Sequence, residues 1–227
     1  MITVDLADTS LRELNKRLHA LPPDTNETAW EVLHPLGQHA IAAGLDVPIE
    51  LTVRGHAGYY CAGMNKQATV TIDGHCGWGV AENMMSGHVR VKGNASQSAG
   101  ASGHGGLLVI DGDAAARCGI SMKGIDIVVG GDVGHMSAFM GQLGTLVVCG
   151  DAGESLGDSL YEARIFVRGD VESLGADCIE KEMKPEHLEA LAGLLAAADI
   201  DADPGSFRRY GSARKLYNFD VDHADQY

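Results

Sequence analysis

The chain repeats a short alternation of aliphatic and polar residues every nineteen positions. A glycine marks each of seven repeats, and an aliphatic residue stands four and two positions before it. Residues separated by one position share a face of a strand, so the pattern predicts one short strand per repeat with a buried face. The aliphatic pairs are Leu51 and Val53, Val70 and Ile72, Val89 and Val91, Leu108 and Ile110, Ile127 and Val129, Leu146 and Val148, and Ile165 and Val167.

A strand that recurs at a fixed period near twenty residues is typical of a solenoid, in which each unit stacks on the last. The leucine-rich repeat is an alternative, but its consensus leucines and asparagine are missing. We predict an all-β fold, a single-stranded right-handed parallel β-helix of about seven coils. The repeated glycines are expected to adopt positive φ at the corners. These structural turn glycines are Gly55, Gly74, Gly93, Gly112, Gly131, Gly150, Gly153, Gly157 and Gly169.

Both ends of the rod have sequences that predict helical caps. Ser10 and Glu13 form a capping box before a leucine stripe, and Pro185 opens a second stripe that runs to about residue 198. We expect an N-terminal cap or docking segment over residues 1–48 with one helix, the β-helix over 49–178, and a C-terminal helix with a partner-binding tail over 179–227. The two stripes are Leu11, Leu14, Leu18 and Leu21, and Leu188, Leu191, Leu194 and Leu195.

Charge and composition narrow the classes of partner. The net charge of -14 disfavours nucleic acid and anionic membrane surfaces. The sequence shows neither a long apolar span nor a signal peptide, so we expect a cytoplasmic protein. Five cysteines without a C-x-x-C pair are expected to be reduced, structural thiols.

The position after each repeat glycine forms a polar column along the predicted rod. Its aspartates could bind calcium between coils, and His56 with His75 could share a metal ion. The calcium-binding nonapeptide is missing, however, and a third ligand for the histidines is not evident. We therefore expect each carboxylate to cap its own turn, and we predict no metal site. The column reads His56, His75, Asn94, Asp113, Asp132, Asp151 and Asp170.

The segment GDAGESLG, residues 150–157, is glycine-rich and follows a predicted strand, as a phosphate-binding loop does. The loop is acidic, however, and the next predicted element is the strand at Ile165 and Val167 rather than a helix. We therefore interpret it as a corner of the solenoid. The sequence predicts no catalytic residue and no cofactor-binding residue in this chain.

The C-terminal segment combines aromatic and basic residues, as the anchors of protein interfaces often do. We expect it to wrap around a partner; the alternative is an arm folded back on its own rod. The proposed anchors are Phe207, Arg208, Arg209, Tyr210, Arg214, Tyr217 and Phe219.

The alternative to a structural protein is a self-contained enzyme that acts on saccharide. Such a cleft needs paired carboxylates with exposed aromatic residues on one face. Aromatic residues in the repeats are few, and the sequence indicates no aromatic aisle. They are Tyr59, Tyr60, Trp78, Phe139, Tyr161 and Phe166.

The repeat unit reads G-x-x-G-x-x-x-G, in full at Gly150, Gly153 and Gly157. It resembles the C-terminal GXGXG-motif domain of the glutamate synthase large chain, a right-handed β-helix, over about residues 49–178. The same fold occurs in one of the subunits of formylmethanofuran dehydrogenase. The segments GWGVAENMMSG, GNASQSAGASG, GGDVGHMSAFMG and GDAGESLGDSLYEARIFVRG are most similar to the free-standing β-helix subunit of N-methylglutamate synthase.

This resemblance implies a non-catalytic structural subunit of a hetero-oligomeric complex. Its implied partners are a glutaminase-like amidotransferase subunit and a synthase subunit that carries FMN and an iron-sulfur cluster, with no cofactor in this chain. The implied reaction converts methylamine and glutamate to N-methylglutamate and ammonia. Membership of an ordinary glutamate synthase or of a formylmethanofuran dehydrogenase-like complex remains the alternative.

Overall fold

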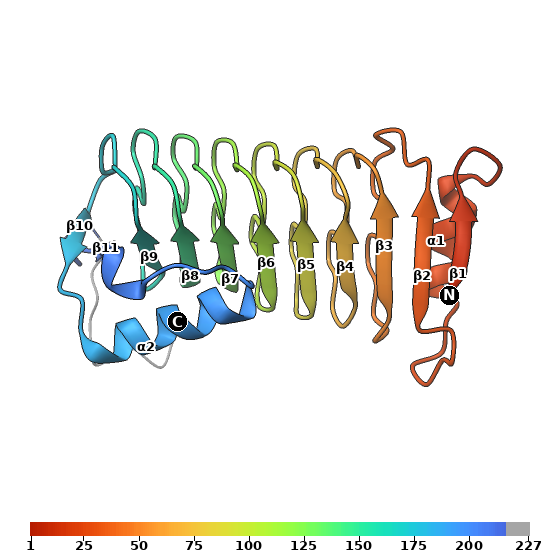
Figure 1. Ribbon diagram of the computed structural model, residues 1–227. Helices are drawn as coiled ribbons and strands as arrows, with labels where there is room; N and C mark the ends of the chain where they lie inside the picture. Colours follow the sequence, from red (N-terminus) through yellow and green to blue (C-terminus); the bar gives the residue numbers. More distant parts are fainter. Residues whose placement is uncertain (217–227) are drawn as a thin grey trace.

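The computed structural model describes residues 1–216, which form an elongated rod with a helix at each end (Figure 1). Its eleven strands make one sheet in the order β1-β2-β3-β4-β5-β6-β7-β8-β9-β11-β10. The strands are β1 (Ile2–Asp5), β2 (Ala29–Leu33), β3 (Glu50–Arg54), β4 (Thr69–Ile72), β5 (His88–Val91), β6 (Leu107–Ile110), β7 (Lys123–Val129), β8 (Leu143–Val148), β9 (Arg164–Val167), β10 (Cys178–Lys181) and β11 (Arg208–Ser212). The helices are α1 (Leu11–His19), α2 (Pro185–Ala197) and the short 3-10 helix η1 (Pro204–Ser206).

The predicted parallel solenoid of about seven nineteen-residue coils is confirmed. Strands β3 to β9 pair in parallel, and Leu51 aligns with Val70, which aligns with Val89 in the next coil. This register places like side chains above one another, so the aliphatic column fills the inside of the rod.

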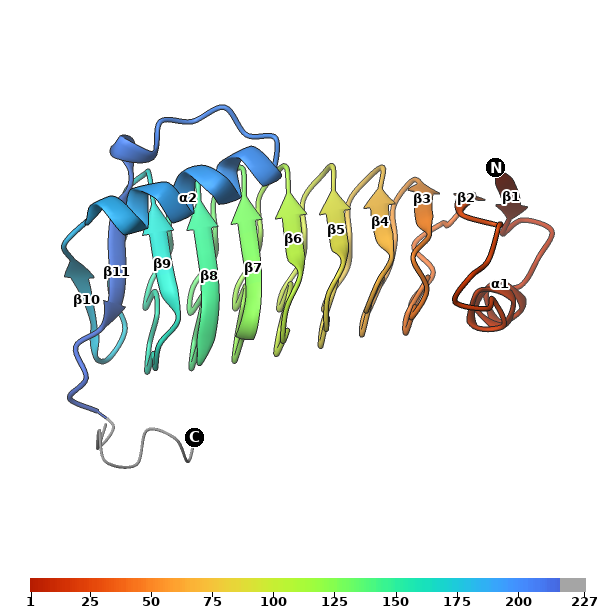
Figure 2. The ribbon, with the colours of Figure 1, turned by 90° about the horizontal axis from the view of Figure 1, so that it is seen from below.

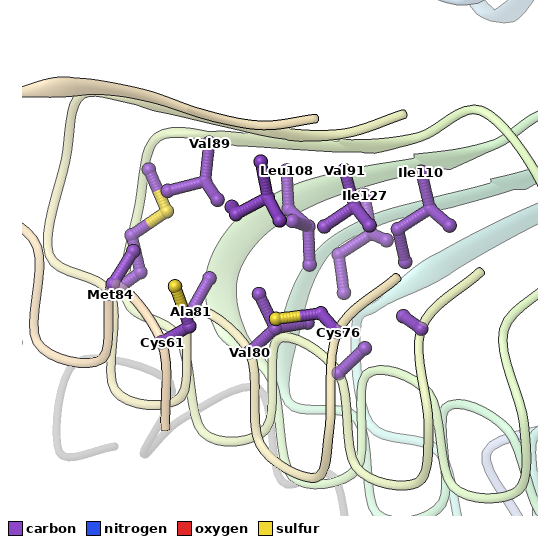
Figure 3. Packing of buried hydrophobic residues seen from close by; sticks show 14 of the residues in the cluster. Cys61, Cys76, Val80, Ala81, Met84, Val89, Val91, Leu108, Ile110 and Ile127 are labelled. Atoms are coloured by element: carbon purple, nitrogen blue, oxygen red, sulfur yellow. The ribbon is translucent and has the colours of Figure 1, made fainter. Parts of the chain in front are cut away.

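The core lies between two walls of each coil. One wall carries the strand residues, such as Val89 and Leu108, and the other carries small residues, such as Cys76 and Ala81, which face the strands across the interior (Figure 3). The second wall has its own ladder of single bridges, including Ala57 with Cys76. Small residues are suited to this wall because they allow the two walls to approach closely.

The expected positive φ at each repeat glycine is wrong for most of them. Gly55 has φ 132°, but Gly150 and its equivalents in the other coils lie outside the positive range. Glycine is needed at these positions because a side chain would not fit: a Cβ on Gly93 would lie 2.5 Å from His75 Nδ1. Positive φ occurs instead seven positions later, at Gly157 with φ 65° and even at Ala138 with φ 58°.

The N-terminal end adds strands as well as a helix. β1 pairs with β2 and β2 with β3, both in parallel, so the ladder begins inside the segment expected to be only a cap. Helix α1 buries Leu14 and Leu18 against the core, and the Ser10 hydroxyl accepts a hydrogen bond from the Glu13 N–H at 3.2 Å. The predicted helix therefore covers the core of the first coils.

The C-terminal end folds back on the rod. Helix α2 lies across the outer face of β7 to β9 (Figure 2), where Leu191 and Leu195 join an apolar cluster with Val147 and Phe166. β11 then pairs antiparallel with both β9 and β10. The chain thus closes its own last coil, and this limits exposure of strand edges.

Candidate functional site

The polar column forms a continuous hydrogen-bonded ladder between coils. The N–H of Asp151 donates to Oδ1 of Asp132 at 2.7 Å, and the N–H of Asp170 donates to Oδ1 of Asp151 at 2.8 Å. Oδ1 of Asn94 likewise accepts from the N–H of Asp113 at 3.1 Å. The expectation that each carboxylate caps its own turn is therefore wrong for Asp113, Asp132 and Asp151, because each of them accepts from the coil that follows.

The two histidines at the start of this column have the same role. Nδ1 of His56 accepts from the N–H of His75 at 2.9 Å, and the rings stack with centroids 4.9 Å apart. Nδ1 of His75 in turn accepts from the N–H of Asn94 at 2.8 Å. The arrangement fixes both rings, with Nδ1 as the acceptor.

Carboxylates of the column border a shallow depression of about 360 Å³ that Asp132, Asp151, Asp170 and Glu172 line. Within residues 1–216, no three His, Cys, Asp or Glu side chains lie close enough together to hold a metal ion. One oxygen each of Asp132 and Asp151 already accepts a backbone N–H. The column therefore joins neighbouring coils, and its chemistry is that of a structural ladder.

The GDAGESLG segment is a corner of the rod. Ala152 pairs with Val133 and Val171 of the neighbouring coils, and the chain then continues to strand β9. A Cβ on Gly153 would lie 3.1 Å from the backbone nitrogen of His135, so close coil packing accounts for this glycine. In the described chain the next element after the loop is strand β9, whereas a phosphate cradle of this type requires a helix N-terminus there.

An exposed aromatic stack lies along the first coils. The ring of Tyr59 lies between those of His39 and Trp78, with centroids 4.3 Å and 5.9 Å away. Tyr59 is 45% exposed and Trp78 50% exposed, and Tyr60 and Met64 of the Tyr59 coil are also exposed. Two of the few aromatic residues of the repeats, Tyr59 and Trp78, thus lie side by side at this place.

Tyr59 and Trp78 share a repeat position, four residues after the glycine, so their alignment follows from the nineteen-residue period. His39 could not be found that way, because it precedes the first repeat glycine. His39 is held by the Tyr59 N–H, which donates to its Nδ1 at 2.9 Å.

The proposed tail anchors divide into three groups. Phe207 and Tyr210 are buried against the chain's own rod at 5% and 2% exposure, so they are not available as surface anchors. The segment that contains Phe207 and Tyr210 is therefore an arm folded back on its own rod, which was the alternative prediction. Tyr217 and Phe219 lie outside the described residues.

The three arginines of the tail also contact the rod. Arg208 Nη2 donates to the Gly169 carbonyl at 2.7 Å, and Arg209 Nη1 donates to the Glu182 carbonyl at 3.1 Å. Arg214 pairs with Glu162 at 2.7 Å. They therefore help to hold β11 at the end of the sheet.

All five cysteines are free and buried. Burial raises the pKa of the Cys118 thiol to about 12, and a hydrogen bond with Cys76, together with burial, raises that of Cys61. A thiol with a raised pKa is a poor nucleophile at neutral pH. These side chains act as small apolar core residues.

The chain is 64% identical over 228 residues to Protein GlxC of Rhizobium meliloti (strain 1021), and the match covers 100% of both chains. No protein-family model and no solved structure matches the chain. Within the described residues, neither helix has the length and apolar character needed to cross a membrane.

Proposed function

Because the chain belongs to the family of Protein GlxC, we propose that it is a non-catalytic β-helix subunit of a glutamate-synthase-like complex. The complex is N-methylglutamate synthase, which forms N-methylglutamate and ammonia from methylamine and glutamate. In this proposal the chain holds a glutaminase-like amidotransferase subunit and an FMN and iron-sulfur synthase subunit together in the cytoplasm. The repeat motif and its resemblance to the glutamate synthase domain support this assignment.

The exposed aromatic stack is the observation that best supports a role of this chain in assembly. Tyr59 and Trp78 are large, half-exposed and ordered by stacking, and Tyr60 and Met64 of the same coil as Tyr59 are also exposed. Aromatic residues and methionine are enriched in the buried centre of protein interfaces. Because stacking already restricts the rings, a partner would lose less side-chain entropy on binding them.

A saccharide-cleaving enzyme has less support from the same surface. Sugar cleavage requires a pair of carboxylates beside the aromatic platform. The polar-column residues of the aromatic coils are His56 and His75, whereas Asp132 and Asp151 stand three to five coils further along. The aromatic residues are therefore better suited to contact with a protein.

The test is co-purification of a Tyr59→Ala/Trp78→Ala double variant from the native cell, with the retained proteins identified by mass spectrometry. The proposal predicts that the wild type retains the amidotransferase-like and flavin-containing subunits and that the double variant loses them. Leu143→Ala is the control, because Leu143 is 57% exposed at the start of β8, away from the stack. Equal retention by both variants would refute the assignment of the stack.

A further inference from the structure

Three cations share the outer face of the sheet at its C-terminal end. Lys181 of β10 lies directly opposite Arg209 of β11, and Arg209 lies opposite Phe166 of β9. Arg164 precedes Phe166 by two residues, so it lies on the same face of β9. Like charges on directly opposed residues destabilise a sheet, so this arrangement lowers the stability of the sheet unless a counterion is bound.

Two acids of the described chain act on these cations without forming an ion pair within 4 Å: Glu186 on Arg209, and Asp126 with Arg164. Arg209 Nη1 donates to the Glu182 carbonyl at 3.1 Å, whereas its Nε is buried without a hydrogen-bond partner. Among residues 1–216, neither Arg164 nor Lys181 forms an ion pair within 4 Å. Glu162, the acid on the same rim, pairs with Arg214 at 2.7 Å.

The cations line a depression of about 270 Å³, which Gly211 and Ser212 also border. One water occupies about 30 Å³ of liquid, so the depression has room for an anion of several heavy atoms. Gly211 carries no side chain between the cations, and the Ser212 hydroxyl is held by Asp177 at 2.6 Å. The basic depression is defined as Arg164, Lys181, Arg209 and Arg214 with these two residues; Glu162 also lines it, paired with Arg214.

The cations also contribute to the lowered pKa of two groups at this place, although burial is the larger cause for both. Burial and then the charge of Arg164 lower the pKa of Arg209. Burial and then the charge of Arg209 lower the pKa of His187, in the first turn of α2. The charge of Glu186 opposes both shifts but does not reverse them, and a bound anion would offset the remaining repulsion among the cations.

We propose that the basic depression binds a small oxyanion, in which two or more oxygens share negative charge as in a carboxylate or a phosphate. Guanidinium groups recognise such anions through paired N–H donors, and the lysine adds a mobile point charge. The lining residues of the site come from β9, β10, β11 and adjoining segments, whereas Tyr59 and Trp78 follow β3 and β4, far along the rod from those strands (Figure 1). The site therefore stands independently of the proposed function.

Isothermal titration of the full-length chain with inorganic phosphate and, separately, with L-glutamate tests the proposal at fixed ionic strength. We expect saturable binding of at least one anion, weakened about tenfold by Lys181→Gln and by Arg164→Gln. Arg208→Gln is the matched control, because it removes the same charge from β11 but its side chain contacts Gly169 and Asp170.

The two anions distinguish a phosphate-bearing ligand from a carboxylate ligand. Binding of phosphate alone assigns a phosphate-bearing ligand, and binding of glutamate alone assigns a carboxylate; either result supports the site. The proposal is overturned if neither anion binds saturably. It is also overturned if Arg208→Gln weakens binding as much as Lys181→Gln while circular dichroism shows all variants folded.

Discussion

Oδ1 of Asp132 accepts a hydrogen bond of 2.7 Å from the backbone N–H of Asp151, which is the equivalent residue of the next coil. This contact repeats along the polar column and ties neighbouring coils together at one edge of the rod. Side chains that were candidate ion ligands thus have a structural role.

Asp132→Asn should be nearly neutral, and Asp132→Ala should lower the free energy of unfolding by about 1 kcal/mol. An asparagine keeps the acceptor oxygen, as Asn94 does for the N–H of Asp113 at 3.1 Å, whereas alanine leaves the Asp151 N–H without it. Urea denaturation of both variants measures the difference. Equal stability of the two variants would contradict the ladder.

Gly131→Ala should destabilise the rod by roughly 1–3 kcal/mol, because the new methyl group would overlap the Asp113 side chain of the preceding coil. Gly193→Ala is the matched control in helix α2, where nothing lies within 4 Å of the added carbon. That variant should be more stable than the wild type by about 1 kcal/mol. Thermal unfolding of both proteins gives the comparison, and a tolerated alanine at position 131 would refute the steric explanation.

The buried thiol of Cys118 should make the fold sensitive to alkali. Its pKa is raised to about 12, above the value of about 8.5 for an unfolded thiol. The folded state therefore keeps a proton that the unfolded state loses, so stability falls as pH rises from about 8.5 towards 12.

Cys118→Ala removes one such group, so its unfolding free energy should decline less steeply than that of the wild type, by about 1.4 kcal/mol per pH unit. Denaturation at several pH values between about 9 and 11 measures the slopes. Below pH 8 the two proteins should show the same pH dependence, which provides the control. Equal slopes at high pH would show that this thiol is not protected.

Phe207→Ala should cost roughly 3–5 kcal/mol of stability, because Phe207 is buried with Leu191 and Phe166 in the cluster under α2. Leu216→Ala is the control, since Leu216 is 51% exposed and should change stability by less than about 0.5 kcal/mol. Unchanged stability of Phe207→Ala together with lost partner binding would restore Phe207 as an interface anchor.

The nineteen-residue period was sufficient to predict the rod because the period is also the strand register, as the pairing of Leu51 with Val70 shows. It did not predict the insertion of β11 between β9 and β10, because five residues that pair antiparallel with distant strands leave no periodic signal. The same limit applies to Arg209, whose cationic neighbours Arg164 and Lys181 come from strands well before it in sequence.

The polar column was visible in the sequence, but its bonding was not. The alignment of Asp132 with Asp151 follows from the period, whereas the direction of each hydrogen bond depends on the corner geometry. That geometry also decides why Gly150 is a glycine: the Asp132 carboxylate occupies the space that a side chain would need.

The most direct test of the account is purification of the wild-type chain from its native cell, followed by mass spectrometry and assays of the recovered material. The account predicts recovery with an amidotransferase-like subunit and a flavin and iron-sulfur subunit, and formation of N-methylglutamate from methylamine and glutamate only by the complex. Recovery of the chain alone, with turnover of any substrate by the isolated chain, would contradict it.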